Sequence, residues 1–124
     1  MSVTINVNEQ LKMFGRDPQT YAKAGADGKV EQLPLTVGFA IMQACGGYQT
    51  KDGREAIRMN RLGIRIMDAE DSESGEMEFD KQDAELARKA IDATTFGAAI
   101  KGPILEMLAD AEEPRHTAAQ KTGA

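Results

Sequence analysis

The chain is poor in cysteine, histidine and aromatic residues. Its 124 residues include one cysteine, one histidine and no tryptophan, and aromatic side chains make up 5% of the total. One cysteine excludes an internal disulfide, which fits a reducing compartment. The histidine, His116, stands in a polar stretch near the end of the sequence, where no imidazole can be positioned for nucleophilic catalysis. These shortages predict a protein without catalytic residues, not an enzyme.

Long apolar runs are missing too. No stretch approaches the roughly 20 residues that span a bilayer, and residues 1–4 lack the cationic start and apolar core of a signal peptide. No Gly-x-Gly-x-x-Gly segment follows a strand, and Gly46-Gly47 lacks the downstream Gly-Lys-Ser/Thr of a phosphate-binding loop. We therefore expect a cytosolic protein with no membrane contact and no cofactor.

What the sequence does contain is the pattern of a small α+β domain. Residues 2–8 alternate polar and apolar side chains, as a half-buried strand does. Residues 20–24 and 29–35 flank an Asp-Gly turn signal, which predicts a hairpin. Pro34 places the second of these strands at a sheet edge. We expect this small N-terminal β-hairpin or sheet to pack on three to four α-helices.

Capping residues mark where the helices begin. Thr36, Asp52 and Asp80 each precede a helical pattern. Proline suits the first turn of a helix, so Gly102-Pro103 predicts the start of the last one. The first three predicted helices cover residues 37–45, 53–69 and 81–94. Six apolar side chains of the last three helices are expected in the core: Leu62, Ile66, Leu86, Ile91, Ile104 and Leu108.

Two finer expectations concern the interior and the ends of this domain. Gly38 lies inside the first predicted helix, at a cost of about 1 kcal/mol against alanine, which predicts a close approach by a neighbouring element. The apolar stripe of the second helix is predicted to include Ala56 and Met67. From residue 114 the sequence turns polar. We therefore expect a single domain over residues 1–113 and a flexible C-terminal tail over 114–124.

Four arginines recur at helical spacing in the second predicted helix. Arg54, Arg58, Arg61 and Arg65 fall at i, i+4, i+7 and i+11, so one helix face carries all of them. They form a solvated face paired with acidic residues of the same chain, or they bind a protein, since arginine is enriched at interfaces. The third interpretation is contact with nucleic acid, which the net charge of −5 opposes. No direct nucleic-acid contact is expected.

An acidic segment follows the arginines, with nine carboxylates and one lysine between Asp68 and Glu85. Their spacing does not match a calcium-binding EF-hand loop, so no metal site is predicted. A solvated acidic loop is one interpretation, and imitation of nucleic acid is another. The predicted partner-binding residues are the four arginines and four of these carboxylates: Arg54, Arg58, Arg61, Arg65, Asp71, Glu73, Glu76 and Glu78.

The order of elements between residues 27 and 112 has a counterpart in a known group of proteins. It is carried by the segments Asp27-Gly28-Lys29, Leu35-Thr36-Val37-Gly38, Arg58-Met59-Asn60-Arg61-Leu62, Asp80 with Asp83 and Glu85, and Pro103 to Leu108. It resembles small tailed-phage proteins that are encoded among virion and tail-assembly genes. The first 26 residues depart from this pattern.

The resemblance implies a non-catalytic protein that binds other phage proteins during particle assembly, as a tail-assembly chaperone does. Such a protein is found in the host cytoplasm or associated with the virion. The charge pattern allows a second function, an acidic inhibitor that binds a host defence or nucleic-acid-handling protein. Both hypotheses predict a protein partner, a phage structural protein or a host protein, and leave a homo-oligomer open.

Overall fold

The computed structural model describes residues 2–112 of the chain. The predicted α+β class is confirmed, whereas the predicted tail over 114–124 lies outside the described residues. The elements follow in this order: β1 (Ser2–Asn6), β2 (Lys12–Met13), β3 (Asp17–Pro18), β4 (Thr20–Ala24), β5 (Val30–Pro34), α1 (Val37–Gly46), α2 (Gly53–Glu70), β6 (Glu76–Asp80), α3 (Lys81–Asp92) and α4 (Ala98–Glu112).

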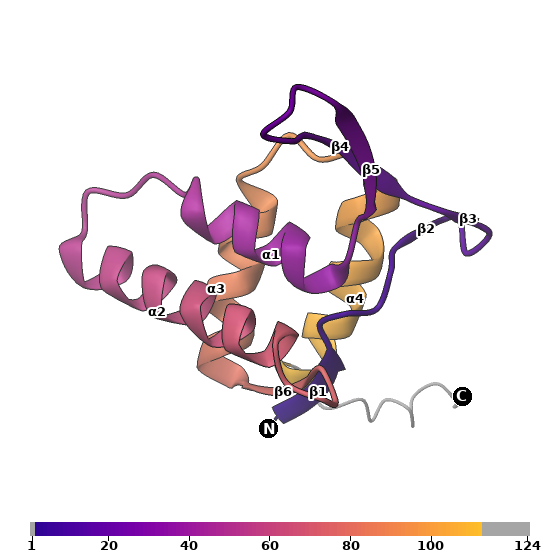
Figure 1. Ribbon diagram of the computed structural model, residues 1–124. Coiled ribbons are helices and arrows are strands. Elements are labelled where there is room, and N and C mark those ends of the chain that lie inside the picture. The colour runs from indigo at the N-terminus through magenta and orange to yellow at the C-terminus, as the bar shows by residue number, and fades with distance from the viewer. Residues whose placement is uncertain (1, 113–124) are drawn as a thin grey trace, which may run out of the picture.

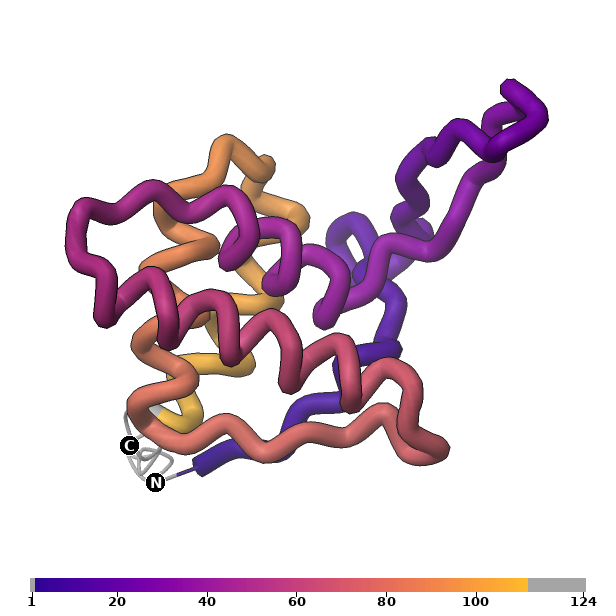
Figure 2. Tube along the Cα trace, turned by 60° about the vertical axis from the view of Figure 1, so that its left-hand side comes forward, coloured from indigo at the N-terminus to yellow at the C-terminus, as the bar shows by residue number. Residues whose placement is uncertain are grey.

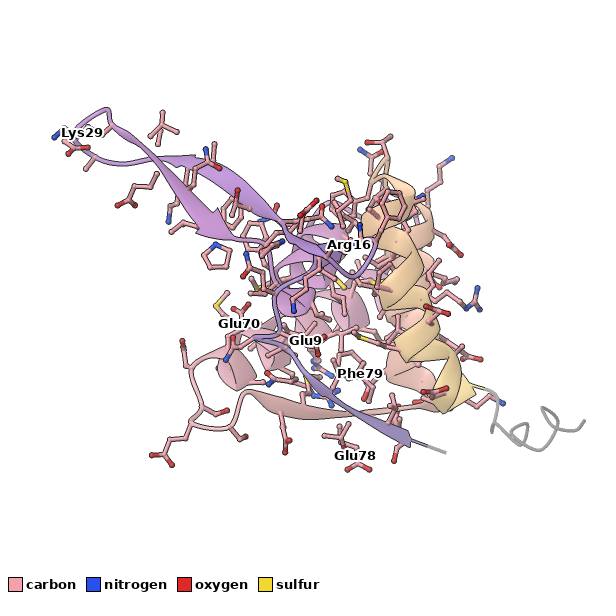
Figure 3. All side chains as sticks on the ribbon, turned by 90° about the vertical axis from the view of Figure 1, so that its right-hand side faces the viewer. Glu9, Arg16, Lys29, Glu70, Glu78 and Phe79 are labelled. Atoms are coloured by element: carbon pink, nitrogen blue, oxygen red, sulfur yellow. The ribbon has the colours of Figure 1, made fainter. Side chains whose placement is uncertain are left out.

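The first strand pairs with the last one. β1 and β6 run antiparallel, with Val3 opposite Phe79 and Ile5 opposite Met77. Because side chains alternate across a strand, these residues face the helices while Glu78 points to solvent. Figure 3 shows Phe79 turned toward the helices and Glu78 on the outer side of the ribbon. The alternation of residues 2–8 thus predicted a real strand, which ends at Asn6, and Met77 and Phe79 of β6 are buried on the same face.

The four helices pack mainly in two pairs. α1 lies against α2, α3 lies against α4, and α1 crosses α3 (Figure 1). α2 and α3 contact each other less closely than either contacts its own pair partner. The core between the pairs is filled by large side chains that are fully buried: Phe79, Ile41, Leu62, Ile66, Ile91, Ile104, Leu108, Val7 and Val37.

Two hairpins leave the body at a single point. Three backbone hydrogen bonds close a ring there: Leu11 N–H donates to Leu35 O, Leu35 N–H to Gln19 O, and Gln19 N–H to Leu11 O, at 2.8 to 2.9 Å. The short β2–β3 hairpin and the longer β4–β5 hairpin both begin and end at this ring. Figure 2 shows the β4–β5 hairpin projecting away from the helices.

The predicted starts of the first three helices are confirmed. Thr36 Oγ1 accepts a hydrogen bond from Phe39 N–H, and Asp52 Oδ1 accepts from Arg54 N–H. Asp80 and Asp83 form a reciprocal capping box at the start of α3. Gly38 meets the predicted close neighbour, because a Cβ there would lie 2.7 Å from Val7 Cβ and 2.9 Å from Val7 O. Gly38 N–H donates to that carbonyl oxygen.

The predicted start of the last helix is wrong. α4 begins at Ala98 and contains Pro103. Proline lacks the N–H that would donate to Ala99 O one turn earlier. The side-chain amide of Gln19, at the base of the hairpins, donates to Ala99 O instead. A residue distant in the sequence therefore compensates for the missing donor and lets the helix continue through the proline.

Three apolar residues are more exposed than the sequence predicted. Ala56 and Met67 of α2 face solvent, and Leu86 of α3 is half-buried. The other five residues predicted for the core on these helices are fully buried. The apolar stripe that faces the core is therefore narrower than predicted, since Met59, Leu62 and Ile66 are the buried residues of α2.

Candidate functional site

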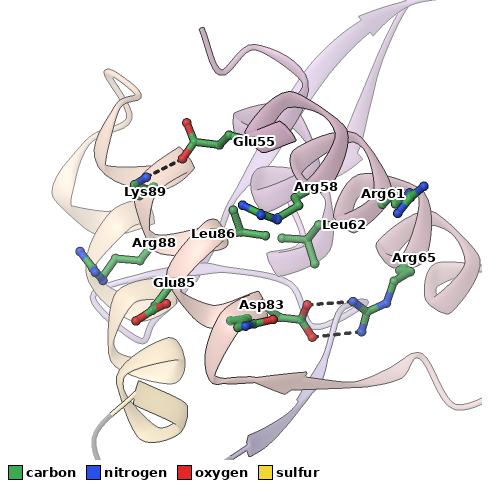
Figure 4. A pocket seen from close by; sticks show the side chains of 11 residues that line it. Glu55, Arg58, Arg61, Leu62, Arg65, Asp83, Glu85, Leu86, Arg88 and Lys89 are labelled. Atoms are coloured by element: carbon green, nitrogen blue, oxygen red, sulfur yellow. Dashed lines mark hydrogen bonds and ion pairs between the residues drawn. The ribbon is translucent and has the colours of Figure 1, made fainter. Parts of the chain in front are cut away.

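An open groove runs between α2 and α3 where the two helices separate (Figure 4). Its volume is about 760 Å³. Five cationic side chains and three carboxylates line it, in a chain whose net charge is negative. The lining residues are Glu55, Arg58, Arg61, Leu62 and Arg65 from α2, and Gln82, Asp83, Glu85, Leu86, Arg88 and Lys89 from α3.

One end of the groove is closed by Arg65 and Asp83. Arg65 Nη1 donates to Asp83 Oδ1 at 2.8 Å, and Nη2 donates to Asp83 Oδ2 at 3.1 Å. The same carboxylate accepts the Asp80 N–H, so it completes the capping box of α3 as well. The hydrogen bond to Asp83 raises the pKa of the Arg65 guanidinium. This two-pronged contact ties α2 to the first turn of α3.

The other end is closed by Glu55 and Lys89. Lys89 Nζ donates to Glu55 Oε2, and Thr50 Oγ1 donates to Glu55 Oε1 at 2.8 Å. The hydrogen bond from Lys89 lowers the pKa of Glu55, and the same bond raises the pKa of Lys89. Both groups therefore stay charged over the physiological range. Asp52 and Glu55 do not form a reciprocal capping box, because the Asp52 N–H donates to Thr50 Oγ1 and not to Glu55.

Arg58 and Arg61 lie between these two closed ends. Neither guanidinium forms an ion pair with another of the residues 2–112. In Figure 4 Arg58 reaches from α2 toward Leu86 of α3. Leu62, which is fully buried, and the half-buried Leu86 provide an apolar floor beneath the charges. A groove with an apolar floor and cationic walls suits a ligand that has both an apolar part and a negative charge.

The structure separates the predicted partner-binding arginines into two groups. Arg58, Arg61 and Arg65 line the groove, and Arg54 does not. The predicted pairing of the arginines with the acidic segment holds for one pair alone among the described residues, Arg65 with Asp83. Asp83 was not among the eight predicted binding residues.

The four predicted carboxylates lie outside the groove. Asp71 caps the C-terminus of α2, and Glu73 is in the exposed loop that follows. Glu76 and Glu78 point outward from β6, where Ser2 Oγ donates to Glu78 at 2.6 Å. They form a separate acidic surface on the β1–β6 side of the molecule.

Sequence reasoning missed the α3 wall of the groove. Gln82, Glu85 and Leu86 fall at i, i+3 and i+4, and Lys89 follows one turn later, which places them on one helix face. That spacing was readable in the sequence. What could not be read was that this face turns toward the arginines of α2, because the relative position of the two helices depends on the core packing of α1 and α4.

Other candidate chemistry finds little support within residues 2–112. Cys45 is buried at the end of α1, and burial raises the pKa of its thiol to about 11. A thiol of this kind is a poor nucleophile. No group of three or more metal-ligating side chains occurs in the described part of the chain. No helix within it is long and apolar enough to cross a membrane.

Comparison of the chain with known protein families, with curated protein sequences and with solved structures finds no match.

Proposed function

We propose that this protein is a non-catalytic binding protein of a tailed bacteriophage, which binds another phage protein during particle assembly through the α2–α3 groove. The main evidence for a binding site is the pair Arg58 and Arg61. Their guanidinium groups have no ion-pair partner among the described residues, and they lie above the apolar floor formed by Leu62 and Leu86. The phage context rests on the resemblance of residues 27–112. Its partner is a phage structural protein.

The groove favours binding over catalysis because two of its three carboxylates already have structural roles. Asp83 is held by Arg65 and by the capping box, and Glu55 is held by Lys89 and Thr50. A general acid or base needs a pKa near the working pH, whereas the pKa of Glu55 is lowered from its ordinary value. The two ion pairs instead keep the walls of the groove in place.

The chemistry of the groove specifies the kind of segment that it would bind. Guanidinium groups meet carboxylates in a planar, two-pronged geometry that lysine cannot reproduce. Arg58 and Arg61 lie almost one helical turn apart on α2. A short amphipathic segment that presents two carboxylates on one side and an apolar side chain toward Leu62 and Leu86 would match the groove.

The experiment is capture followed by titration. The immobilised protein is exposed to a lysate of phage-infected cells, and the captured protein is identified, purified and titrated against wild type and two double variants. Arg58→Ala with Arg61→Ala should weaken binding strongly, since each buried charged pair lost costs about 2–5 kcal/mol. Arg58→Lys with Arg61→Lys should weaken it less, because the charge remains and the two-pronged contact does not.

The matched control removes two cations elsewhere. Arg16 and Lys29 are exposed on the two hairpins (Figure 3), so Arg16→Ala with Lys29→Ala makes the same change in net charge outside the groove. Circular dichroism checks that each variant folds. Binding of the Arg58 and Arg61 alanine variant at wild-type affinity would exclude the groove, and capture of no phage protein would oppose the assembly role.

A second candidate function follows from the separate acidic surface. Asp71, Glu73, Glu76 and Glu78 are all exposed, and none forms an ion pair with another of the residues 2–112. An inhibitor that binds a cationic host protein would use this surface and not the groove. Capture that survives loss of Arg58 and Arg61 but fails for Glu76→Gln with Glu78→Gln would favour this alternative.

A further inference from the structure

α2 carries a second apolar stripe that faces solvent. Ile57, Ile64 and Met67 are 52%, 49% and 51% exposed. Their spacing of seven and three residues places them on one side of the helix, and none of the three lines the groove. α2 lies at the periphery of the molecule (Figures 1 and 2). Large apolar side chains grouped on an exposed helix mark an interaction surface more often than isolated ones do.

Charged side chains flank this stripe at both ends of α2. Arg54 lies in the first turn beside Glu55 and the N-cap Asp52, two carboxylates that suit the helix dipole, whereas the last turn carries acidic residues and no basic one. Asp68 lies in that last turn, and Asp71 caps it. The acidic last turn lowers the stability of the isolated helix slightly. A cation brought to this end from outside the helix would offset that cost.

A second copy of α2 in antiparallel orientation covers the apolar stripe and brings Arg54 to the acidic end of the other helix, with Arg61 of each copy close to the twofold axis. We infer that two copies of this chain associate through the stripe of Ile57, Ile64 and Met67, with the two α2 helices antiparallel across a twofold axis. In a twofold contact residue i meets residue j while j meets i. With Ile57 placed against Met67 of the second copy, Ile64 lies near the twofold axis and faces Asn60 of the second copy.

The same register brings the opposite charges together. Arg54 of one copy then lies level with Glu70 of the other and between its Asp68 and Asp71, at both ends of the contact between the two helices. Each helix also offers its acidic C-terminal end to Arg54 in the first turn of its neighbour, and the two antiparallel helix dipoles attract each other. The acidic C-terminal end, which is unfavourable within one helix, thus meets a cation of the second copy.

The test is self-association of the full chain, measured by analytical ultracentrifugation over a range of concentrations. A seam of one helix pair is smaller than a standard interface, so a dissociation constant of about 10 µM to 1 mM is expected. Ile64→Glu should abolish association. Arg54→Glu and Asp68→Arg should each raise the dissociation constant about tenfold or more, because each places like charges together.

Combining the two charge-reversal variants should restore association, which a general loss of structure in either variant could not do. Arg54→Glu mixed with Asp68→Arg should form a mixed dimer, and the double variant should associate with itself. Both single variants improve the match to the helix dipole, so neither should lower the melting temperature of the monomer. Arg16→Glu and Glu106→Arg make the same charge changes at exposed sites off the stripe and should associate as wild type does.

The outcomes decide the inference without reference to the groove, because Ile64 and Asp68 do not line it. Reversible association that is lost in each single variant and regained in the mixture supports it. A wild-type chain that stays monomeric up to about 1 mM overturns it. Single charge reversals that associate like wild type, or a mixture that stays monomeric, overturn it equally.

Discussion

Arg65 and Asp83 connect α2 to α3 through two hydrogen bonds, 2.8 Å from Nη1 to Oδ1 and 3.1 Å from Nη2 to Oδ2. The Asp83 side chain is 12% exposed and that of Arg65 is 50% exposed. The mostly buried carboxylate thus depends on a partially solvated cation. Asp83 also accepts the Asp80 N–H, so one side chain joins a helix cap to an interhelical contact.

Replacing Asp83 should therefore affect stability through two interactions at once. Asp83→Ala removes the capping box and the partner of Arg65, and it should lower the free energy of unfolding by about 1–3 kcal/mol. Urea denaturation measures the change. Glu85→Ala removes an exposed carboxylate two residues along the same helix and should stay within about 0.5 kcal/mol. Equal effects of the two substitutions would contradict the role assigned to Asp83.

The two leucines of the groove floor should differ in their effect on stability. Leu62 is 1% exposed and belongs to the core, so Leu62→Ala should cost about 2–5 kcal/mol. Leu86 is half-buried, and Leu86→Ala should cost about 1–2 kcal/mol because less apolar area returns to water. Met67→Ala, on the exposed stripe, serves as the control. A loss below about 0.5 kcal/mol for Leu62→Ala would show that the core stripe of α2 is misplaced.

Two glycines in helices should respond to alanine with opposite signs. A Cβ at Gly38 would meet Val7 Cβ at 2.7 Å and the Val7 carbonyl oxygen at 2.9 Å, and a carbonyl oxygen cannot move without the backbone that carries it. Gly38→Ala should destabilise the protein by about 1–3 kcal/mol despite the better helix propensity of alanine. At Gly63 nothing lies within 4 Å, so Gly63→Ala should stabilise by about 0.5–1 kcal/mol. Thermal unfolding of both variants checks the sign.

Glu70 should make stability depend on pH. Its carboxylate lies beside Gly38, and burial followed by repulsion from Asp71 raises its pKa above the ordinary 4.5. A raised pKa means that the fold favours the protonated form. The stabilisation is complete below the unfolded pKa and is lost as the pH rises through the folded value.

Glu70→Gln, which is neutral at every pH, should therefore melt at a higher temperature than wild type at pH 7. Below about pH 4 the two proteins should converge. Glu73→Gln removes an exposed negative charge nearby and controls for the change in net charge. A difference between Glu70→Gln and wild type that is the same at pH 7 and pH 3.5 would mean that titration of Glu70 is not its cause.

Local signals in the sequence predicted the elements better than the contacts between them. Thr36, Asp52 and Asp80 cap helices as expected, since a capping residue acts on N–H groups within three positions of itself. The start of α4 was missed because Pro103 is accommodated by Gln19 from the base of the hairpins. No local pattern contains that contact.

In the candidate site too, local spacing was predictable from the sequence and contacts between helices were not. The arginines of α2 were found from their spacing alone. Their surroundings were not, because only the packing of the helix pairs decides that Arg65 reaches Asp83 while Arg58 and Arg61 remain without an ion-pair partner among residues 2–112. The pairing of β1 with β6 joins opposite ends of the domain, and residue patterns carry no information about such a distant partner.

The ring of hydrogen bonds among Leu11, Gln19 and Leu35 has a consequence for how such a chain can evolve. The path of the chain leaves the body and returns to it at one point, so residues 12–34 are an excursion that the helices do not enclose. Insertions, deletions or exchanged turns in either arm would alter its reach and its tip without rerouting the helices. The outer parts of the arms can therefore change independently of the body across generations, while the ring, the hydrogen bond from Gln19 to Ala99 O and the stacking of Tyr21 on Phe39 keep their base attached to the helices.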